Sequence, residues 1–537
     1  MTKCKMDWGR VPGRLVLVSI ALLLATLHAA PAPAATYALG ATALGEGPAA
    51  GIDSIVLAAS PQNATWTATN NAAWLHLGAA SQSGAGSTNV IFTFDANSGP
   101  TRTGTLTIAG QTLTISQAGS TYVAVSLPAT ALVASGLHAP TGVAVGPSGN
   151  VYIADNDNNT IRKWTATNNT VTTVTTSGLS SPAAVAVDGA GNVYIANTYS
   201  NAIVKWTATN GTVTTLVSNG LNEPFGVAVD NAGNVYIADT LNNAIKEWTI
   251  ASNTVVTLLS NGLFHPFGVA VDGADNVYIA DYGNNAIKEW TGPSNAVTTV
   301  TTNGLSSPAG VAVDGAGNVY LADSGNNAIK KWTAANNTLT TLVASGLSYP
   351  FSVAVDSAGN VYIADTLNNA IKELPRAFVD PTAKTEGNAA GSDTLPAVLP
   401  ATENLNIPFA PGSDQPWLAI NGVTNGQVSF AFSSSSGTNR TAHLTLLGQT
   451  IPVTQTTGVI TPPILAAATT LGNGLFQFTF SNNPGAAFTV LSATNLSLPL
   501  TNWTVAGTPT NISPGVFQFT VPVSTNDSQL FYRVRSP

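Results

Sequence analysis

The chain has 537 residues, of which 44% are hydrophobic and only 8% are charged, and its 18 Lys and Arg are outnumbered by 26 Asp and Glu. At about 150 residues per domain, this length predicts three or four domains. The net charge of −8 argues against a nucleic-acid-binding protein, because such proteins need clustered Lys and Arg to displace the counterions of the phosphates.

Residues 1–35 have the pattern of a secretory signal peptide. Four basic residues precede an apolar run over 15–27, and small residues surround an expected cleavage site after Ala34. This run of 13 residues is too short to span a bilayer, and we expect no transmembrane segment later in the chain. Cleavage would remove Cys4, the only cysteine, together with four basic residues and one acidic residue, leaving 14 basic and 25 acidic residues. We therefore predict an exported protein that is secreted, periplasmic or held at the cell surface.

Residues 36–120 and 377–458 are predicted to form two related β-sandwiches. Both contain Glu-Gly-x-Ala-Ala-Gly, then a Trp-Leu pair, and then an Arg-Thr pair that precedes a β-rich run. The matching segments are 46–53 with 386–393, 73–77 with 416–420, and 102–112 with 440–450. The Trp, the Arg-Thr pair and the terminal Gln resemble those of BACON domains, which are small immunoglobulin-like sandwiches. This resemblance implies an association with bacterial carbohydrate-active or surface proteins, and the family's name implies carbohydrate binding.

Trp74 and Trp417 have two interpretations. Each indole could serve as a stacking platform for a sugar ring, or it could pack in the core of its sandwich. We favour the core, because a single Trp beside aliphatic residues in a small sandwich usually packs inside.

Residues 124–376 contain six copies of a 42-residue unit. Each copy carries Asn-Val-Tyr-Ile-Ala-Asp or a close variant, and prolines and tryptophans recur in the same register. The copies of this segment begin at Asn150, Asn192, Asn234, Asn276, Asn318 and Asn360. One unit holds four short β-rich runs, at 225–229, 234–238, 244–248 and 254–258. Four strands in a unit of about 40 to 45 residues are typical of propeller blades, so we predict an all-β chain with a six-bladed β-propeller flanked by immunoglobulin-like β-sandwich domains.

The repeat also predicts how the ring of blades closes. The sixth unit lacks a fourth strand, and residues 131–137 resemble 341–347, which hold the fourth strand of the fifth unit. We therefore expect residues 129–135 to complete the sixth blade and to pair its exposed edge. Over 130–375, the motifs Pro-x-Gly-Val-Ala-Val-Asp, Gly-Asn-Val-Tyr-Ile-Ala-Asp and Asn-Asn-Ala-Ile-Lys resemble the NHL repeat family. This resemblance implies the propeller fold but no single activity, because relatives include ligand-binding sensors, RNA-binding regulators and a few lyases.

Two recurrent charged positions of the repeat need an interpretation. The Asp that follows the second strand could belong to a calcium ring, or it could bond the amides of the Asn-Asn turn that follows it, and we favour this structural role. These positions are Asp155, Asn197, Asp239, Asp281, Asp323 and Asp365. The lysines of the third strands are expected to be solvated at the blade edges. They are Lys246, Lys288, Lys330 and Lys372.

The default binding site is the mouth of the propeller, where the loops before each first strand and after each second strand emerge on one face. The residues of these loops vary between blades, whereas the scaffold residues do not. The candidate ligand-binding residues are Glu223, Phe225, His265, Phe267, Tyr349, Phe351 and His138. The aromatic side chains would supply apolar contact, and Glu223 and His265 would add polarity.

Glu223 and His265 stand on adjacent blades and could act as a catalytic base and its orienting partner. The alternative is a pair of exposed loop residues, which we favour because no third partner is visible. His138 lies three blades from His265, so we expect no shared metal, and we predict no cofactor. NHL-like amidating lyases hold zinc through several propeller histidines, and this sequence lacks that set.

Residues 461–537 are β-rich, with alternating apolar residues at 475–480 and 517–521, and predict a third sandwich. For the whole chain we predict a secreted or cell-surface binding protein, whose propeller mouth takes an unknown protein or carbohydrate ligand. Two alternatives stay open. The propeller could be a lyase or hydrolase that uses His265 and Glu223, or the chain could be a structural or adhesive component of the envelope.

Overall fold

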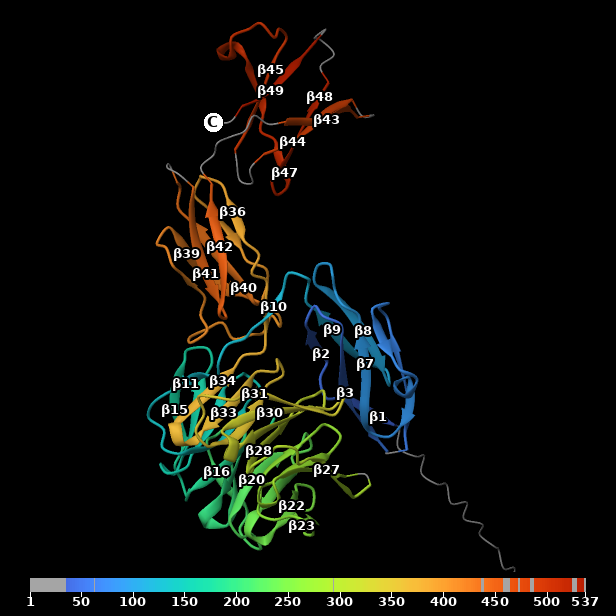
Figure 1. Cartoon of the computed structure of the whole chain (residues 1–537), viewed down its shortest axis with the longest axis vertical. Helices are drawn as coiled ribbons and strands as arrows, with labels where there is room; N and C mark the ends of the chain where they lie inside the picture. The colour runs from blue at the N-terminus through green and yellow to red at the C-terminus, as the bar shows by residue number, and fades with distance from the viewer. Residues whose placement is uncertain are drawn as a thin grey trace, which may run out of the picture.

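The computed structural model describes residues 35–61, 63–292, 294–435, 439–456, 464–471, 474–482, 487–523 and 529–535. The expected signal peptide, apart from its last residue, lies outside the described residues. Strands make up nearly all of the regular structure, with a few short 3-10 turns. Figure 1 shows, from blue to red, an N-terminal sandwich, a propeller, a second sandwich and a C-terminal β unit. No helix in these residues is long and apolar enough to cross a membrane.

The N-terminal sandwich consists of two sheets, with strand orders β1-β3-β7-β5 and β2-β9-β8-β4-β6. The first sheet contains β1 (Thr36–Leu39), β3 (Gly51–Ser60), β7 (Thr88–Phe94) and β5 (Leu75–Leu77). The second contains β2 (Ala43–Glu46), β9 (Gln111–Gln117), β8 (Arg102–Ile108), β4 (Thr65–Asn70) and β6 (Ser83–Ala85), and η1 (Ala79–Ser81) precedes β6. Phe92, Leu106 and Ile115 lie buried in the core. Successive side chains of a strand point to opposite faces of the sheet, so every second residue of these strands faces the core.

The propeller contains six four-stranded antiparallel sheets, and we number these blades 1 to 6 along the chain. The first strands are β12 (Pro140–Val145), β16 (Pro182–Val187), β20 (Pro224–Val229), β24 (Pro266–Val271), β28 (Pro308–Val313) and β32 (Pro350–Val355). The second strands are β13 (Val151–Asp155), β17 (Val193–Asn197), β21 (Val235–Asp239), β25 (Asn276–Asp281), β29 (Val319–Asp323) and β33 (Val361–Asp365). The third strands are β14 (Thr160–Thr165), β18 (Ala202–Trp206), β22 (Ala244–Thr249), β26 (Ala286–Thr291), β30 (Ala328–Thr333) and β34 (Ala370–Leu374). The fourth strands are β15 (Thr170–Thr175), β19 (Val213–Val217), β23 (Thr254–Leu259), β27 (Ala296–Thr301), β31 (Thr338–Val343) and, in blade 6, β11 (Thr130–Val133).

Both faces of a blade are covered by its neighbours, which explains the continuous apolar runs of the second strands. Tyr236 and Ile237 are neighbours in β21, and both are buried although their side chains point to opposite faces. Close packing also limits side-chain size near the axis. A Cβ atom on Gly226 would collide with the carbonyl of Phe267 in the next blade, so the first strands need small residues there.

The sheet order of blade 6 is β11-β34-β33-β32. Thr130 lies opposite Glu373, and Ala131 lies opposite Lys372, so an N-terminal segment supplies the strand that the sixth repeat lacks. This pairing confirms the closure predicted from the repeat. The two ends of the propeller are therefore joined by backbone hydrogen bonds, and β34 is not left as an open edge.

The second sandwich also has two sheets, with orders β36-β42-β41-β38 and β37-β40-β39. Its strands are β36 (Lys384–Glu386), β37 (Gly391–Thr394), β38 (Gly412–Ser413), β39 (Leu418–Thr424), β40 (Gln427–Phe432), β41 (Arg440–Leu446) and β42 (Gln449–Gln455). The short strands β10 (Val123–Ala124) and β35 (Phe378–Val379) pair where the chain enters and leaves the propeller. The C-terminal unit contains β43 (Ile464–Thr470), β44 (Leu475–Ser481), β45 (Thr489–Ala493), η7 (Leu500–Asn502), β46 (Thr504–Gly507), β47 (Thr510–Ser513), β48 (Val516–Pro522) and β49 (Phe531–Arg535).

One arrangement of three side chains recurs in the two sandwiches. In the first, the Arg102 guanidinium lies 4.4 Å from the centre of the Trp74 ring, and its Nε donates to Gln117 Oε1 at 2.8 Å. In the second, Arg440 lies 4.3 Å from the Trp417 ring centre and donates to Gln455 at 2.9 Å. This arrangement gives the shared Trp, Arg and Gln a structural role.

The two tryptophans pack partly as predicted. Trp74 and Trp417 both lie against the cores of their sandwiches, but each is only partly buried. The guanidinium groups that lie over the rings supply the remaining contact, since an arginine is attracted to the face of an indole. A ring face already covered by arginine is a poor platform for a sugar.

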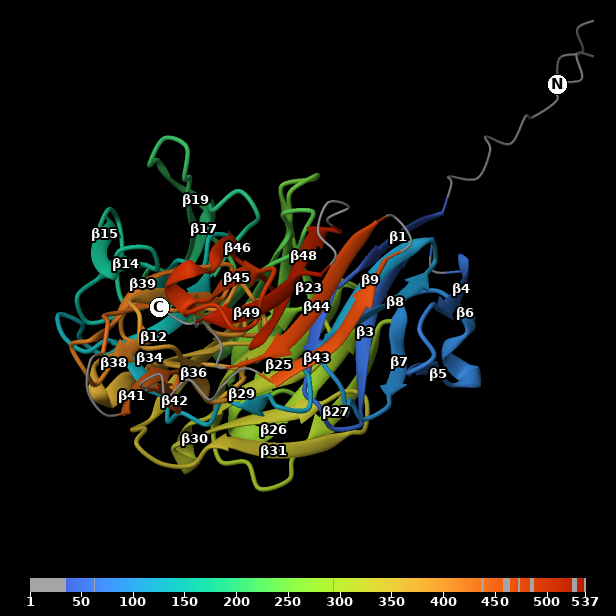
Figure 2. The same cartoon turned by 90° about the horizontal axis from the view of Figure 1, so that it is seen from above.

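Both sandwiches dock on the face of the propeller that carries the turns between first and second strands. Ser54 Oγ of the N-terminal sandwich donates to the Ala316 carbonyl of blade 5 at 2.6 Å, and Val56 N–H donates to the Gly315 carbonyl at 3.0 Å. Figures 1 and 2 show this sandwich beside the propeller, and Figure 1 shows the second sandwich at one end of the propeller. The loops of the mouth lie at the opposite ends of the blade strands, so this docking leaves the mouth uncovered.

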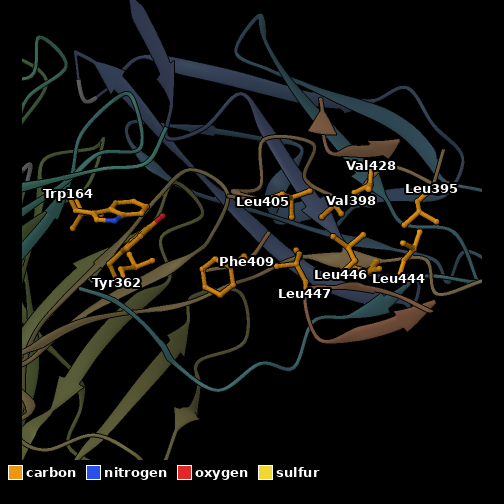
Figure 3. Close-up of a cluster of buried hydrophobic side chains, with 14 of the residues drawn as sticks. Trp164, Tyr362, Leu395, Val398, Leu405, Phe409, Val428, Leu444, Leu446 and Leu447 are labelled. Carbon is orange, nitrogen blue, oxygen red and sulfur yellow. The ribbon is translucent and has the colours of Figure 1, made fainter. Parts of the chain in front are cut away.

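The second sandwich is joined to the propeller by a continuous apolar core (Figure 3). Trp164 of blade 1 and Tyr362 of blade 6 belong to the same buried cluster as Leu405 and Phe409, which lie in the loop between β37 and β38. The cluster continues to Leu444 inside the sandwich. This shared core fixes the sandwich to the propeller at the junction between the first and last blades.

Candidate functional site

The loops at the mouth are held by hydrogen bonds from two blades. In blade 3, Asp239 Oδ1 accepts the backbone N–H of Asn222 at 2.7 Å. Asn201 Oδ1 of blade 2 accepts the next N–H, that of Glu223, also at 2.7 Å. The same two bonds recur around the ring, and the Ala139 N–H of blade 1 donates to Asn369 Oδ1 of blade 6 at 2.8 Å. The ring is therefore also closed at the mouth.

These bonds hold the residue before each proline in the left-handed backbone region. Its φ lies between 46° and 52° in all six blades, although none of the six residues is glycine. They are Ala139, Ser181, Glu223, His265, Ser307 and Tyr349. Such a conformation is costly for a residue with a Cβ atom and persists only where surrounding contacts impose it. The side chains at this position therefore project from a fixed backbone.

The predicted structural role of the recurrent aspartates is confirmed in part. Asp239 Oδ2 accepts the side-chain amide of Asn242 in the following turn at 2.8 Å, as expected. Asp239 Oδ1 instead reaches the loop before the proline, which was not expected. The aspartate thus joins the two loops of the mouth within one blade, a contact between residues 17 positions apart that local turn chemistry does not predict.

The predicted solvation of the third-strand lysines is wrong. Lys246 Nζ lies 2.6 Å from Asp239 Oδ2, and its side chain is only 14% exposed. A buried carboxylate requires a nearby cation, and the lysine on the adjacent strand supplies it. The equivalent ion pairs are Arg162 with Asp155, Lys288 with Asp281, Lys330 with Asp323, and Lys372 with Asp365.

A third hydrogen bond links consecutive blades behind the mouth. Thr240 Oγ1 of blade 3 donates to the Pro266 carbonyl of blade 4 at 2.8 Å. The equivalent donors in other blades are Asn156, Thr198, Ser324 and Thr366, which reach Pro182, Pro224, Pro350 and Pro140. Blade 4 has Tyr282 at this position, and the tyrosine hydroxyl contacts the hydroxyl of Tyr349 at the mouth.

Tyr282 joins a cluster of aromatic rings at the mouth. Its ring stacks on Phe267 with centroids 4.2 Å apart, and its hydroxyl lies 2.8 Å from the hydroxyl of Tyr349. Phe267 stacks on Phe225 at 4.8 Å and lies 5.5 Å from Phe351. Blades 3, 4 and 6 thus contribute to one continuous aromatic surface, which we call the aromatic cluster (Phe225, Phe267, Tyr282, Tyr349 and Phe351).

The aromatic cluster borders a cavity of about 250 Å³ along the propeller axis. The first strands of all six blades line this cavity, and Phe225, Phe267 and Phe351 are among the lining residues. Burial and the hydrogen bond with Tyr282 raise the pKa of Tyr349 to about 12. Its hydroxyl is therefore neutral at physiological pH and can both donate and accept a hydrogen bond.

Large apolar side chains are also exposed around the rim of the mouth. Tyr199 is 68% exposed and lies in η2 (Thr198–Ser200), directly after a second strand. The other exposed rim residues are Leu241, Phe264 and Leu367. The His265 ring stacks on Phe264, with centroids 4.4 Å apart. Apolar groups gathered around one opening are typical of a binding surface.

Comparison with known families agrees with this architecture. A model described as "BACON: Putative binding domain, N-terminal" matches residues 64–118, and the NHL repeat model matches residues 137–164 and 305–332. The chain carries NHL repeats and a BACON domain. The family model matches only the first sandwich, but the second repeats the Trp, Arg and Gln arrangement of this BACON domain. No curated protein matches the chain.

Several solved structures resemble this chain. A streptogramin B lyase is 15% identical, with 48% of this chain and 98% of that chain covered and a TM-score of 0.37. A Bacteroides thetaiotaomicron protein of unknown function is 15% identical, with 64% and 98% covered and a TM-score of 0.43. An auxiliary nutrient binding protein of the same species is 13% identical, with 63% and 96% covered and a TM-score of 0.40. At TM-scores below 0.5, these likenesses carry no argument about function.

The NHL propeller brings together four of the predicted residues, namely Phe225, Phe267, Tyr349 and Phe351. Tyr282 was missed by sequence reasoning, although its departure from the Asn, Thr or Ser of the other blades could have indicated it. The candidate binding residues were chosen from the segment around each proline, whereas Tyr282 follows the second strand of its blade.

The polar candidates are not joined into a catalytic group. Glu223 and His265 lie on neighbouring mouth loops, but no hydrogen bond or ion pair connects them in the described part of the chain. His138 is exposed and lies 3.3 Å from Asp157 of its own blade. Among the described residues, no group of three or more His, Cys, Asp and Glu could hold a metal ion.

Proposed function

We propose that this chain is an exported binding protein whose NHL propeller recognises a ligand through the aromatic cluster at its mouth. The proposal depends on Tyr282, which stands where the other blades have a small polar residue. In five blades the side chain at this position donates a hydrogen bond to a proline carbonyl of the next blade. The Tyr282 side chain instead adds a ring and a hydroxyl to the aromatic cluster. A position that departs from its structural role in one repeat, and adds an aromatic ring to a half-buried cluster at the mouth, points to binding.

The chemistry of the mouth fits a ligand with an apolar face and hydroxyl groups, as a sugar ring has. Phe267 and its neighbours offer stacking surfaces, and the hydroxyls of Tyr282 and Tyr349 offer hydrogen bonds next to them. Glu223 and His265 add polar groups at the rim. The BACON domain supports an extracellular binding role, since BACON domains are typical of extracellular bacterial proteins.

The test is a glycan-array screen of the full chain, followed by titration of the best ligand. Phe267→Ala should weaken binding by at least about tenfold, because it removes the ring that stacks on both Phe225 and Tyr282. Ile250→Ala is the matched control, since Ile250 is an exposed apolar residue at the opposite end of its blade. Unchanged affinity of Phe267→Ala would reject the mouth as the binding site.

Tyr282→Thr separates binding from folding. Threonine would restore the hydroxyl that other blades direct at the next proline carbonyl, here that of Pro308, so thermal stability should be retained or rise slightly. Affinity should fall because the ring and its bond to Tyr349 are lost. Full affinity in this variant would remove the observation on which the proposal depends.

A further inference from the structure

A second cavity, of about 300 Å³, lies where blade 6 meets the second sandwich. Asp356, Asn360 and Tyr362 of the propeller form one wall, and residues 401–406, in the loop between β37 and β38 of the sandwich, form another. Thr402, Asn406 and Asn425 also line the cavity and are exposed, so it is open to solvent. We call this space the joint cavity. It lies on the face opposite the mouth and is separate from the proposed ligand site.

Two glutamates are buried at and beside the joint cavity. Glu403 lines the cavity and is 6% exposed, and neither of its carboxylate oxygens accepts a well-aligned hydrogen bond, although the side chain of Asn360 lies near them. Glu373 of β34 does not line the cavity itself. It is fully buried beside Tyr362, which does line it, and the oxygens of Glu373 also lack well-aligned hydrogen bonds. A buried carboxylate without a partner is unfavourable, so a complement for these groups is expected.

A third carboxylate beside them is already satisfied. Asp356 accepts the backbone N–H groups of Ala358 and Asn360, both at 2.9 Å, and the Tyr362 hydroxyl at 3.1 Å. It therefore adds negative charge to the joint cavity without serving as a partner for the glutamates. Glu373 is faced by Glu403, Asp356 and Tyr362. Glu403 is faced by Asp356 and Asn360.

This set contains no cation, and burial together with the neighbouring carboxylates raises the pKa of Glu373 to about 8. Burial likewise raises the pKa of Glu403 to about 7. Both shifts mean that the charged forms are poorly compensated. The joint cavity thus concentrates uncompensated negative charge.

Another blade shows how a lysine can compensate a carboxylate at this position of the repeat. In blade 2 the residue opposite Tyr194 is Lys205, whose Nζ lies 2.8 Å from the Tyr194 hydroxyl and 3.9 Å from Asp188. In blade 6 the residue opposite Tyr362 is Glu373. The residues at this position are, from blade 1 to blade 6, Lys163, Lys205, Glu247, Glu289, Lys331 and Glu373. Of the three glutamates, only Glu373 is fully buried.

We propose that the joint cavity binds a small ligand that carries a primary ammonium group, which supplies the charge that Lys205 supplies in blade 2. An ammonium has three donors, enough to reach the free carboxylate oxygens and a tyrosine hydroxyl together. A bare metal ion fits less well, because the described residues contain no group of three or more His, Cys, Asp and Glu that could hold one. The cavity volume reaches the lower end of the range typical of small-ligand pockets.

The test measures thermal unfolding and calorimetric binding of the full chain at pH 8 with 1,5-diaminopentane. Pentane-1,5-diol, at matched ionic strength, is the neutral control. The diamine should bind and raise the unfolding midpoint by several degrees, whereas the diol should do neither. Glu403→Gln should weaken diamine binding by at least about tenfold, because it removes the carboxylate that lines the cavity.

Glu373→Lys gives an independent readout. The introduced ammonium should fill the site, raise the midpoint of the ligand-free chain and abolish diamine binding, whereas Glu247→Lys at the same repeat position of blade 3 should leave diamine binding unchanged. A wild-type midpoint that falls between pH 6 and pH 9 and does not respond to the diamine would overturn the proposal. That result would mean that protonation alone neutralises the two glutamates.

Discussion

The residues at the positions of Asp239 and Lys246 differ together between blades of the repeat. Where blade 3 has this buried carboxylate and its cation, blade 2 has Asn197 and Val204 at the same positions. Asn197 Oδ1 still accepts the N–H of the mouth loop at 2.7 Å, so the hydrogen bond survives the loss of charge. The lysine is therefore needed only where the acceptor is charged, as expected for a buried ion pair.

This paired change predicts the result of two variants of blade 3. Lys246→Ala should lower the free energy of unfolding by about 3 to 5 kcal/mol, because it leaves the carboxylate of Asp239 buried without its cation. The double variant Lys246→Val with Asp239→Asn should lose less free energy of unfolding than Lys246→Ala, since it reproduces the residues of blade 2. Urea denaturation followed by tryptophan fluorescence measures both, and a single variant that is more stable than the double variant would contradict this account.

The strands of each blade could be predicted because their signal is local and is repeated six times. Turn residues, β-branched runs and a fixed period determined the number of blades and even the origin of β11. The bond from the Asn222 N–H to Asp239 and the ion pair of Asp239 with Lys246 could not be predicted, because they depend on which segments the folded blade brings together. Four of the aromatic residues of the mouth followed from loop variation, but the contact between Tyr282 and Tyr349 joins blades 4 and 6 and has no local signal.

The strand β11 is the element on which ring closure depends. Leu132 is buried in the core that blade 6 shares with the second sandwich. Leu132→Asp should detach β11, because an unpaired carboxylate is unfavourable in that core. Amide hydrogen exchange of β34 should then become faster, since its edge loses the backbone bonds to Thr130 and Ala131. Exchange rates of β21 in blade 3 provide the internal reference, and unchanged protection of β34 would show that closure does not depend on this packing.

Both sandwiches lie on the propeller face opposite the aromatic cluster. The N-terminal sandwich contacts the turn between the first and second strands of blade 5, and Asn406 of the second sandwich donates to the Ala166 carbonyl in the turn between the third and fourth strands of blade 1. A large ligand can therefore approach the mouth without contact with the sandwiches. The two joints differ in charge, because Glu46 and Asp53 at the N-terminal joint lie near Lys331 and Arg376, whereas the glutamates of the second joint face no cation.

The N-terminal joint should loosen as the pH rises. Burial and the neighbouring Asp53 carboxylate raise the pKa of Glu46 to about 9, above its ordinary value of 4.5. The docked state therefore retains a proton that the separated state releases, and docking is strongest below the ordinary value and weakens as the pH rises towards 9. Spin labels at Thr88→Cys and Ser252→Cys in a Cys4→Ser chain should report a wider distance distribution at pH 9.5 than at pH 6. Glu46→Gln should remove most of this change because glutamine does not titrate, and a distribution that is identical at both pH values in the wild-type background would show that the Glu46 proton does not control docking.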